Sequence, residues 1–165
     1  MSTISSRMAV AVHVLAFLAW RRSEPQTSER VAGSVNTHPV VVRRLIGALR
    51  KAGLVTVQPG VGGGAQLARD PARITLLDVY RAVEDHEALF AMHASPPSAH
   101  CDIGGNIRGV LGPVFARAHA AMQEELDGVS VADVFQQVVA ARCCGGAAKH
   151  AAETEAAEEA AAGKG

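Results

Sequence analysis

The sequence predicts a mostly α-helical fold with a small β-wing. Apolar residues recur at helical spacing through the first third of the chain, and a glycine-rich stretch then separates two short runs of strand-forming residues. A long amphipathic segment occupies much of the second half. The order of helix, short helix, tight turn, helix and hairpin is that of a winged helix-turn-helix domain, and the long segment predicts a helix that follows it.

The first helix is expected over about residues 6–20. One apolar stripe repeats at helical spacing and predicts its buried face: Met8, Ala11, Val12, Leu15, Leu18 and Ala19. Arg21 and Arg22 follow where the partial negative charge of a helix C-terminus favours cations. Residues 23–26, which include a proline, are expected to form a turn.

A short helix is expected next, with Thr27 or Ser28 as its N-cap and Glu29 in its first turn. Its apolar face consists of Val31, Ala32 and Val35. Asn36 and Thr37 then predict a tight turn into the following helix.

The third helix is expected to run to Ala52, because Gly53 is a stop signal. Thr37 can cap its start, and Pro39 is acceptable in a first turn. Its inward face is predicted to consist of Val42, Leu45, Ile46 and Leu49. The face turned away carries Val40, Arg43, Arg44, Gly47, Arg50 and Lys51.

A two-stranded wing is predicted after this helix. Residues 54–57 and 65–68 have the pattern of short strands, and residues 59–64 form a turn that contains four glycines. Such a turn needs unusual backbone angles, which glycine adopts at little steric cost.

Several helix signals mark the second half. Thr75 and Asp78 form a capping box that opens a helix through about Glu84. Residues 91–105, with paired prolines and paired glycines, are expected to be irregular. Ser130 is expected to cap a last helix that ends near residue 141.

A long helix is expected between them, over about residues 106–126. One of its faces is lined by Ile107, Leu111, Val114, Ala118 and Met122. The Gly112-Pro113 pair should kink this helix or start a second segment.

The net charge of the 165-residue chain is zero, but its distribution is uneven. Residues 1–75 hold ten Lys or Arg and three Asp or Glu, whereas residues 76–165 hold six and thirteen. A basic half joined to an acidic half suggests a polyanion-binding domain attached to another part. We expect no secretory signal, and the apolar run at 8–20 is too short to span a bilayer. The three cysteines form no disulfide framework, so a reducing cytoplasm is the expected location.

The predicted third helix has the layout of a DNA-recognition helix, because one face is apolar and the other is basic. Arg43 and Arg44 are the candidates for reading bases, since an arginine fork bonds guanine O6 and N7 together. The other candidate DNA-binding residues are Thr37, His38 and Val40 near the helix start, Ser28 for a phosphate, Arg50, Lys51 and Arg7 for phosphates generally, and Gly62 and Gly63 in the wing. No hydrolase elbow, phosphate loop or zinc-protease helix occurs, so we expect no enzyme.

The motifs together resemble the Rrf2 family of bacterial transcription regulators over about residues 1–142. They are Ser28-Glu29-Arg30-Val31-Ala32, the run from Leu45 to Val55 with Arg50-Lys51-Ala52-Gly53-Leu54, Gly60-Val61-Gly62-Gly63-Gly64-Ala65-Gln66-Leu67, Ile74-Thr75-Leu76-Leu77-Asp78-Val79, and Ala82-Val83-Glu84. The resemblance implies a homodimer that binds a palindromic operator, which we expect to act as a repressor. It also implies that the long helix pairs with its mate through the face defined above.

This resemblance divides the chain into three expected parts. Residues 1–85 form the winged helix-turn-helix DNA-binding domain, and residues 86–142 form a sensor loop and the dimerisation helices. Residues 143–165, of low complexity, are expected to be frayed helix or disordered tail.

The chain departs from the family pattern at two places. Many members hold an iron–sulfur cluster with three closely spaced cysteines before the long helix, but that region offers only Cys101 here. Cys143 and Cys144 lie more than forty residues further on, so we expect no cluster and no other cofactor. Residues 100–107 instead resemble the cluster-lacking, YwnA-like subgroup. In the wing, Gln58 and Pro59 stand where a basic residue often precedes the glycines, which puts minor-groove contact by an arginine in doubt.

Cys101 is the candidate sensor of an oxidant or electrophile, because a helix N-terminus and the neighbouring His100 both favour a thiolate. Cys143 and Cys144 could be its resolving partners. Metal binding by His86, His93 and His100, which recur every seven residues, is not expected. The alternatives that stay open are a winged-helix protein-interaction module without DNA binding, an iron–sulfur sensor, and a small-molecule effector in place of an oxidant.

Overall fold

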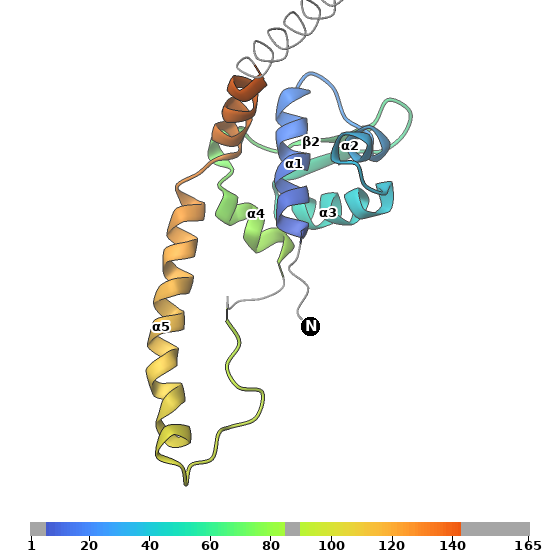
Figure 1. The fold of residues 1–165 in the computed structure, drawn as a ribbon. Helices are drawn as coiled ribbons and strands as arrows, with labels where there is room; N and C mark the ends of the chain where they lie inside the picture. The colour runs from blue at the N-terminus through green and yellow to red at the C-terminus, as the bar shows by residue number, and fades with distance from the viewer. Residues whose placement is uncertain (1–5, 85–89, 143–165) are drawn as a thin grey trace, which may run out of the picture.

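The computed structural model describes residues 6–84 and 90–142 and has the predicted order of elements. Its elements are α1 (Arg7–Trp20), α2 (Ser28–Val35), α3 (Pro39–Lys51), β1 (Val55–Gln58), β2 (Gly64–Leu67), a 3-10 turn (Pro71–Arg73), α4 (Leu76–Val83) and α5 (Asp102–Asp127), and residues 131–142 are also helical. Figure 1 shows α1 to α4 and the hairpin gathered in one body, from which α5 extends as a long arm. The mostly helical fold with a small β-wing is therefore confirmed. No helix in the described ranges combines the length and the apolar character needed to cross a membrane.

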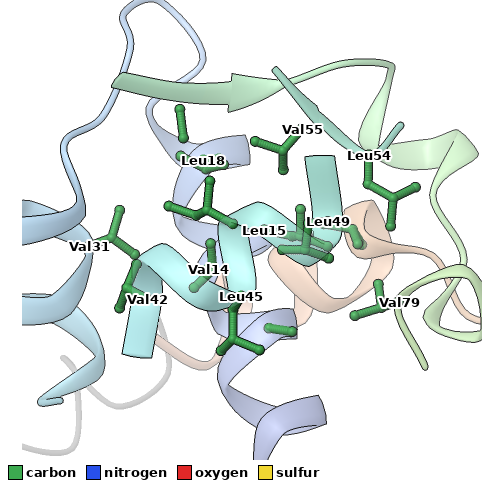
Figure 2. Packing of buried hydrophobic residues seen from close by; sticks show 14 of the residues in the cluster. Val14, Leu15, Leu18, Val31, Val42, Leu45, Leu49, Leu54, Val55 and Val79 are labelled. Atoms are coloured by element: carbon green, nitrogen blue, oxygen red, sulfur yellow. The ribbon is translucent and has the colours of Figure 1, made fainter. Parts of the chain in front are cut away.

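The hydrophobic core joins all four helices of this body to the hairpin (Figure 2). The four predicted inward residues of α3 are all buried, which confirms that face. In α1 the buried residues are Ala11, Val14, Leu15, Leu18 and Ala19. Val14 was not in the predicted stripe, and Met8 and Val12, which were, are only partly buried. Val131, from the segment after α5, is also fully buried in this core.

The start of α3 corrects the predicted cap. The helix begins at Pro39, so His38 and not Thr37 is the N-cap. Proline suits the first helical position because that position lacks an intrahelical partner for its N–H. The ring Nδ1 of His38 accepts a hydrogen bond from the backbone N–H of Val40 at 3.2 Å. In α2 the predicted cap is confirmed, since the Thr27 hydroxyl accepts from the N–H of Arg30 at 3.3 Å.

The wing is a hairpin of β1 and β2, paired in antiparallel register from Val55↔Leu67 to Gln58↔Gly64. The sequence predicts only a turn before α2, but this segment also pairs with the outer edge of β2 through one antiparallel bridge. Gln26 N–H donates to the Ala65 carbonyl at 2.9 Å, and Ala65 N–H donates to the Gln26 carbonyl at 2.8 Å. A Cβ on Gly64 would lie only 2.6 Å from the Gln26 backbone, so glycine permits this close approach.

Two capping boxes tie the second half together. The Thr75 hydroxyl accepts from the Asp78 N–H at 3.1 Å and the Asp78 carboxylate accepts from the Thr75 N–H at 3.2 Å, as predicted. Ser130 and Asp133 form the second box at the start of residues 131–142. A bridge between Thr75 and Ser130 then anchors the end of α5 beside the start of α4.

The long helix corrects two expectations. It begins at Asp102, so residues 102–105 are helical and not irregular. It also runs as one helix through Pro113, and no second segment begins there. Proline removes the bond to the Gly109 carbonyl four residues earlier, and both Gly109 and Pro113 lie on exposed turns of the helix, where solvent can take the place of a lost backbone bond. The predicted tail, His86, Cys143 and Cys144 lie outside the described residues.

Candidate nucleic-acid interface

The outward face of α3 is a row of exposed basic and small side chains. Its opposite face is buried against α1 and the hairpin, so the rotation of the helix is fixed. Arg43, Arg44, Arg50 and Lys51 are all exposed, and Val40 is 39% exposed. Such a helix can enter a major groove with its polar side and keep its apolar side on the domain.

The predicted residues at the start of α3 lie beside the end of α2. His38 is exposed at the N-cap, and Thr37 is half-buried with its N–H bonded to the Ala32 carbonyl at 3.1 Å. Asn36 makes the tight turn in the left-handed conformation, with φ of 57°. Ser28 is half-buried in the first turn of α2. Arg7 begins α1 and is exposed, so it belongs neither to the helix-turn-helix pair nor to the wing.

Arg43 has a partner that sequence reasoning missed. Its Nη2 donates to Oε1 of Glu29 at 2.8 Å, and the two side chains are 56% and 61% exposed. The hydrogen bond from Arg43 holds the pKa of the Glu29 carboxyl below its usual value, with smaller contributions from backbone bonding and the arginine charge. Within the described ranges, Arg44, Arg50 and Lys51 have no ion-pair partner. The three unpaired cations are therefore available to phosphates.

The wing tip is uncharged. Gly60 and Gly62 have positive φ of 94° and 77°, and the Gly63 N–H donates to the Gly60 carbonyl at 3.0 Å. A Cβ on Gly63 would collide with the carbonyl oxygen of Gln58. Val61 is fully exposed at the tip. The turn can thus approach a sugar–phosphate edge closely, but it brings no cation there.

The helix α5 has no buried residue, although one side of it packs on α4 and the preceding loop. Of the predicted dimerisation residues, Val114 is 44% exposed, and Ile107, Leu111, Ala118 and Met122 are half-buried. Two apolar residues outside the face predicted from the sequence are more exposed than these five, Ile103 at 72% and Val110 at 64%. At about 100° per residue, Ile103, Val110 and Val114 form one outward seam.

Cys101 is the exposed N-cap residue of α5, so its predicted place at a helix start is confirmed. Backbone N–H groups of Gly104 and Ile103 donate toward its sulfur and lower the pKa of the thiol. Figure 1 shows this end of α5 far from the helix-turn-helix body. The helix start thus favours the thiolate form, which is the nucleophilic form.

A sequence match decides the family. The family described as "Rrf2: Iron-dependent Transcriptional regulator" matches residues 4–137. The chain belongs to the Rrf2 family. It is also 45% identical, over 135 residues, to the Bacillus subtilis (strain 168) protein named "Putative HTH-type transcriptional regulator YwnA", covering 82% of this chain and 98% of that relative. The resemblance drawn from the motifs is therefore confirmed, as is the prediction that the chain is a regulator and not an enzyme.

Solved structures agree on the fold. One, described as "Crystal structure of a putative DNA binding protein", is 43% identical with a TM-score of 0.64 and covers 78% of this chain and 98% of its own. Another, of IscR from T. potens, is 25% identical with a TM-score of 0.63 and covers 83% of this chain and 88% of its own. The winged-helix architecture of the Rrf2 family is thus shared along most of the chain.

The donor set around Cys101 does not fit the iron that the family description implies. Within residues 6–84 and 90–142, no three His, Cys, Asp or Glu side chains are grouped to hold a metal ion. Cys101 is exposed, and the loop before it supplies no second thiol. A cluster needs several thiolates that converge on one point. The prediction that the chain carries no cluster stays a prediction.

Proposed function

We propose that this Rrf2-family transcription regulator acts as a homodimer that represses transcription by occupying a palindromic operator. The observation that carries the proposal is the fixed rotation of α3, which turns Arg43, Arg44, Arg50 and Lys51 outward beside the wing. The relatives that carry regulator and DNA-binding names support it. Such a regulator works in the cytoplasm, where the bacterial chromosome lies.

DNA engagement follows from the order of side chains along α3. Arg43 and Arg44 lie in its first half, and the N-terminal part of a recognition helix contacts base edges. Each can read a guanine through two parallel N–H bonds. Arg50 and Lys51 lie at the other end, where unpaired cations bind phosphates and release counterions.

Pairing through α5 is supported by its exposed seam. A 26-residue helix with no buried residue leaves Ile103, Val110 and Val114 against water in a single chain. A second copy of α5 would cover them and would join two copies of α3 in one symmetric dimer, and dimeric helix-turn-helix proteins bind two half-sites about one helical turn or a multiple of it apart. Two domains on one operator exclude the transcription machinery from that stretch of DNA.

We also propose that oxidation of Cys101 by a peroxide changes this pairing. The thiolate sulfur attacks one peroxide oxygen, the O–O bond breaks, and a sulfenic acid and hydroxide result. Cys101 lies two residues before Ile103, so a polar group added there changes the start of the pairing seam. The alternative that the sequence leaves open, an iron–sulfur sensor, requires bound iron. We expect protein purified without oxygen to be colourless and free of iron.

The test is binding of the full chain to its own promoter DNA and to random DNA at several salt concentrations. Tight binding to one palindrome that weakens steeply with salt is expected, because phosphate contacts release counterions. Treatment with hydrogen peroxide should weaken that binding, and Cys101→Ser should abolish the response. Equal affinity for random DNA would favour the protein-interaction module instead. An unchanged response of Cys101→Ser would contradict the thiol proposal alone.

A further inference from the structure

We propose that Glu29 is a positioning residue for Arg43: it orients the guanidinium that reads a base and so sets the base preference at one position of each half-site, without touching DNA itself. The inference rests on the proposed function, because it needs α3 to enter a major groove. It adds to the predicted recognition surface an acidic residue of α2 that the sequence did not assign to DNA binding.

The geometry of the pair leaves the reading edge of Arg43 available. One nitrogen, Nη2, donates to Glu29 Oε1 at 2.8 Å. A guanidinium has five N–H donors in a planar fork, so one carboxylate contact leaves donors for a second planar partner. Guanine O6 and N7 require two parallel N–H bonds from that fork. A carboxylate at one edge therefore fixes the plane in which the other donors point.

Prior ordering of Arg43 favours specific binding. An arginine side chain loses much rotamer freedom when it is fixed at an interface. Here Glu29 restricts that freedom before DNA arrives, because both residues stand on helices held by the core. Arg44, which has no ion-pair partner in the described part of the chain, lacks this restraint.

A role in folding does not account for the pair. Both side chains are more than half exposed, and exposed ion pairs add little to stability. An acid beside a DNA-facing surface also repels phosphates and lowers non-specific affinity. The three acids of residues 1–75 differ in the arginine that each contacts. Glu24 contacts Arg30 and Asp70 contacts Arg22, both at 3.8 Å. Glu29 instead accepts a hydrogen bond from a candidate base-reading residue.

The experiment uses the full chain and an operator obtained by selection from random DNA, with each base pair of one half-site then varied. Arg43→Ala identifies the base pair at which discrimination is lost. Glu29→Ala should reduce discrimination at that same pair by about tenfold, the order of one bidentate contact. In the Arg43→Ala background it should have no further effect, because coupled residues are non-additive. Glu29→Gln keeps an acceptor oxygen and should restore part of the discrimination.

Glu24→Ala is the matched control, since it removes the same charge from a neighbouring acid whose arginine is not on α3. It should leave every base preference unchanged. If Glu29→Ala raises affinity for all sequences equally, with or without Arg43, Glu29 only repels phosphates and the inference is wrong. If the unaltered protein prefers no sequence, the proposed function itself fails. Circular dichroism of each variant shows that the fold is retained.

Discussion

His38 is the residue at which folding and recognition meet. Its ring Nδ1 accepts from the N–H of Val40 and so caps α3, while the rest of the ring is exposed at the end expected to enter the groove. Histidine is not among the preferred N-cap residues, and Asn, Asp or Ser at this position would be expected to cap the helix at least as well. The choice of histidine is consistent with a second role that Ser or Asn would not fill.

Replacing His38 tests that double role. His38→Ala should lower the free energy of unfolding by about 1 kcal/mol, because the Val40 N–H loses its acceptor. His38→Asn keeps a capping oxygen and should be as stable as the original, but it should still change DNA affinity. Urea denaturation and operator binding of the two variants separate the effects. Equal stability of His38→Ala would show that the cap contributes nothing.

Cys101 makes a pH-dependent prediction. The Gly104 and Ile103 N–H groups lower the pKa of its thiol, so the thiolate persists to lower pH than in an unfolded chain. In a chain carrying Cys143→Ser and Cys144→Ser, alkylation of Cys101 by iodoacetamide should reach half its maximal rate at lower pH in the folded protein than in urea. Rates measured across pH in both conditions check this. Coincident midpoints would mean that the helix start does not activate the thiol.

At the scale of elements, the sequence predicted most of the fold because local signals decided it. Helical periodicity located α1 and the inward face of α3, and the glycine turn located the hairpin. The predictions were wrong where the local structure depends on contacts between residues that are distant in sequence. Gln26 pairs with Ala65, which lies nearly forty residues further along the chain, and no local sequence pattern predicts this pairing. Pro113 is tolerated because the helix around it is exposed, and exposure is a property of the whole molecule.

The hairpin depends on Gly64. Gly64→Ala should lower the free energy of unfolding by about 1–3 kcal/mol, because its Cβ would press on the Gln26 backbone at 2.6 Å. Gly33 in α2 is the control: nothing lies within 4 Å of its Cβ position. Gly33→Ala should gain about 0.5–1 kcal/mol, the usual helix preference. Thermal or urea unfolding distinguishes them, and similar effects of both would contradict the close approach.

The candidate site shows the same division between local pattern and packing. The basic face of α3 could be predicted, since its residues are neighbours on one helix. The Glu29 partner of Arg43 could not, because the pair forms only when α2 packs against α3 at a particular angle. The sequence alone places Glu29 in the first turn of its helix, where an acid is common, and indicates no further role for it. In α5 the predicted pairing face and the exposed seam share only Val114, because the packing of α4 and the loop decides which side stays exposed in a single chain; the pairing face stays a prediction.

At the scale of the whole molecule, the function requires two recognition helices held at a fixed spacing, and α5 is the element that can provide this. Aspartate at both Val110 and Val114 would bury charges in the proposed seam, and in a symmetric pair each change occurs twice. The dimer dissociation constant should therefore rise by about 100-fold or more, since an unpaired buried charge costs several kcal/mol. Sedimentation measures the change in association.

The affinity for the operator should fall when the dimer dissociates. Each half-site is then bound independently, and the effective concentration of the second domain is lost. The control is Ala116→Asp, which places the same charge about 200° around the helix from Val114. It should leave both association and operator binding unchanged. If the Val110→Asp, Val114→Asp chain still sediments as a dimer, the copies pair through another surface, and the spacing of the two α3 helices must be set by that surface.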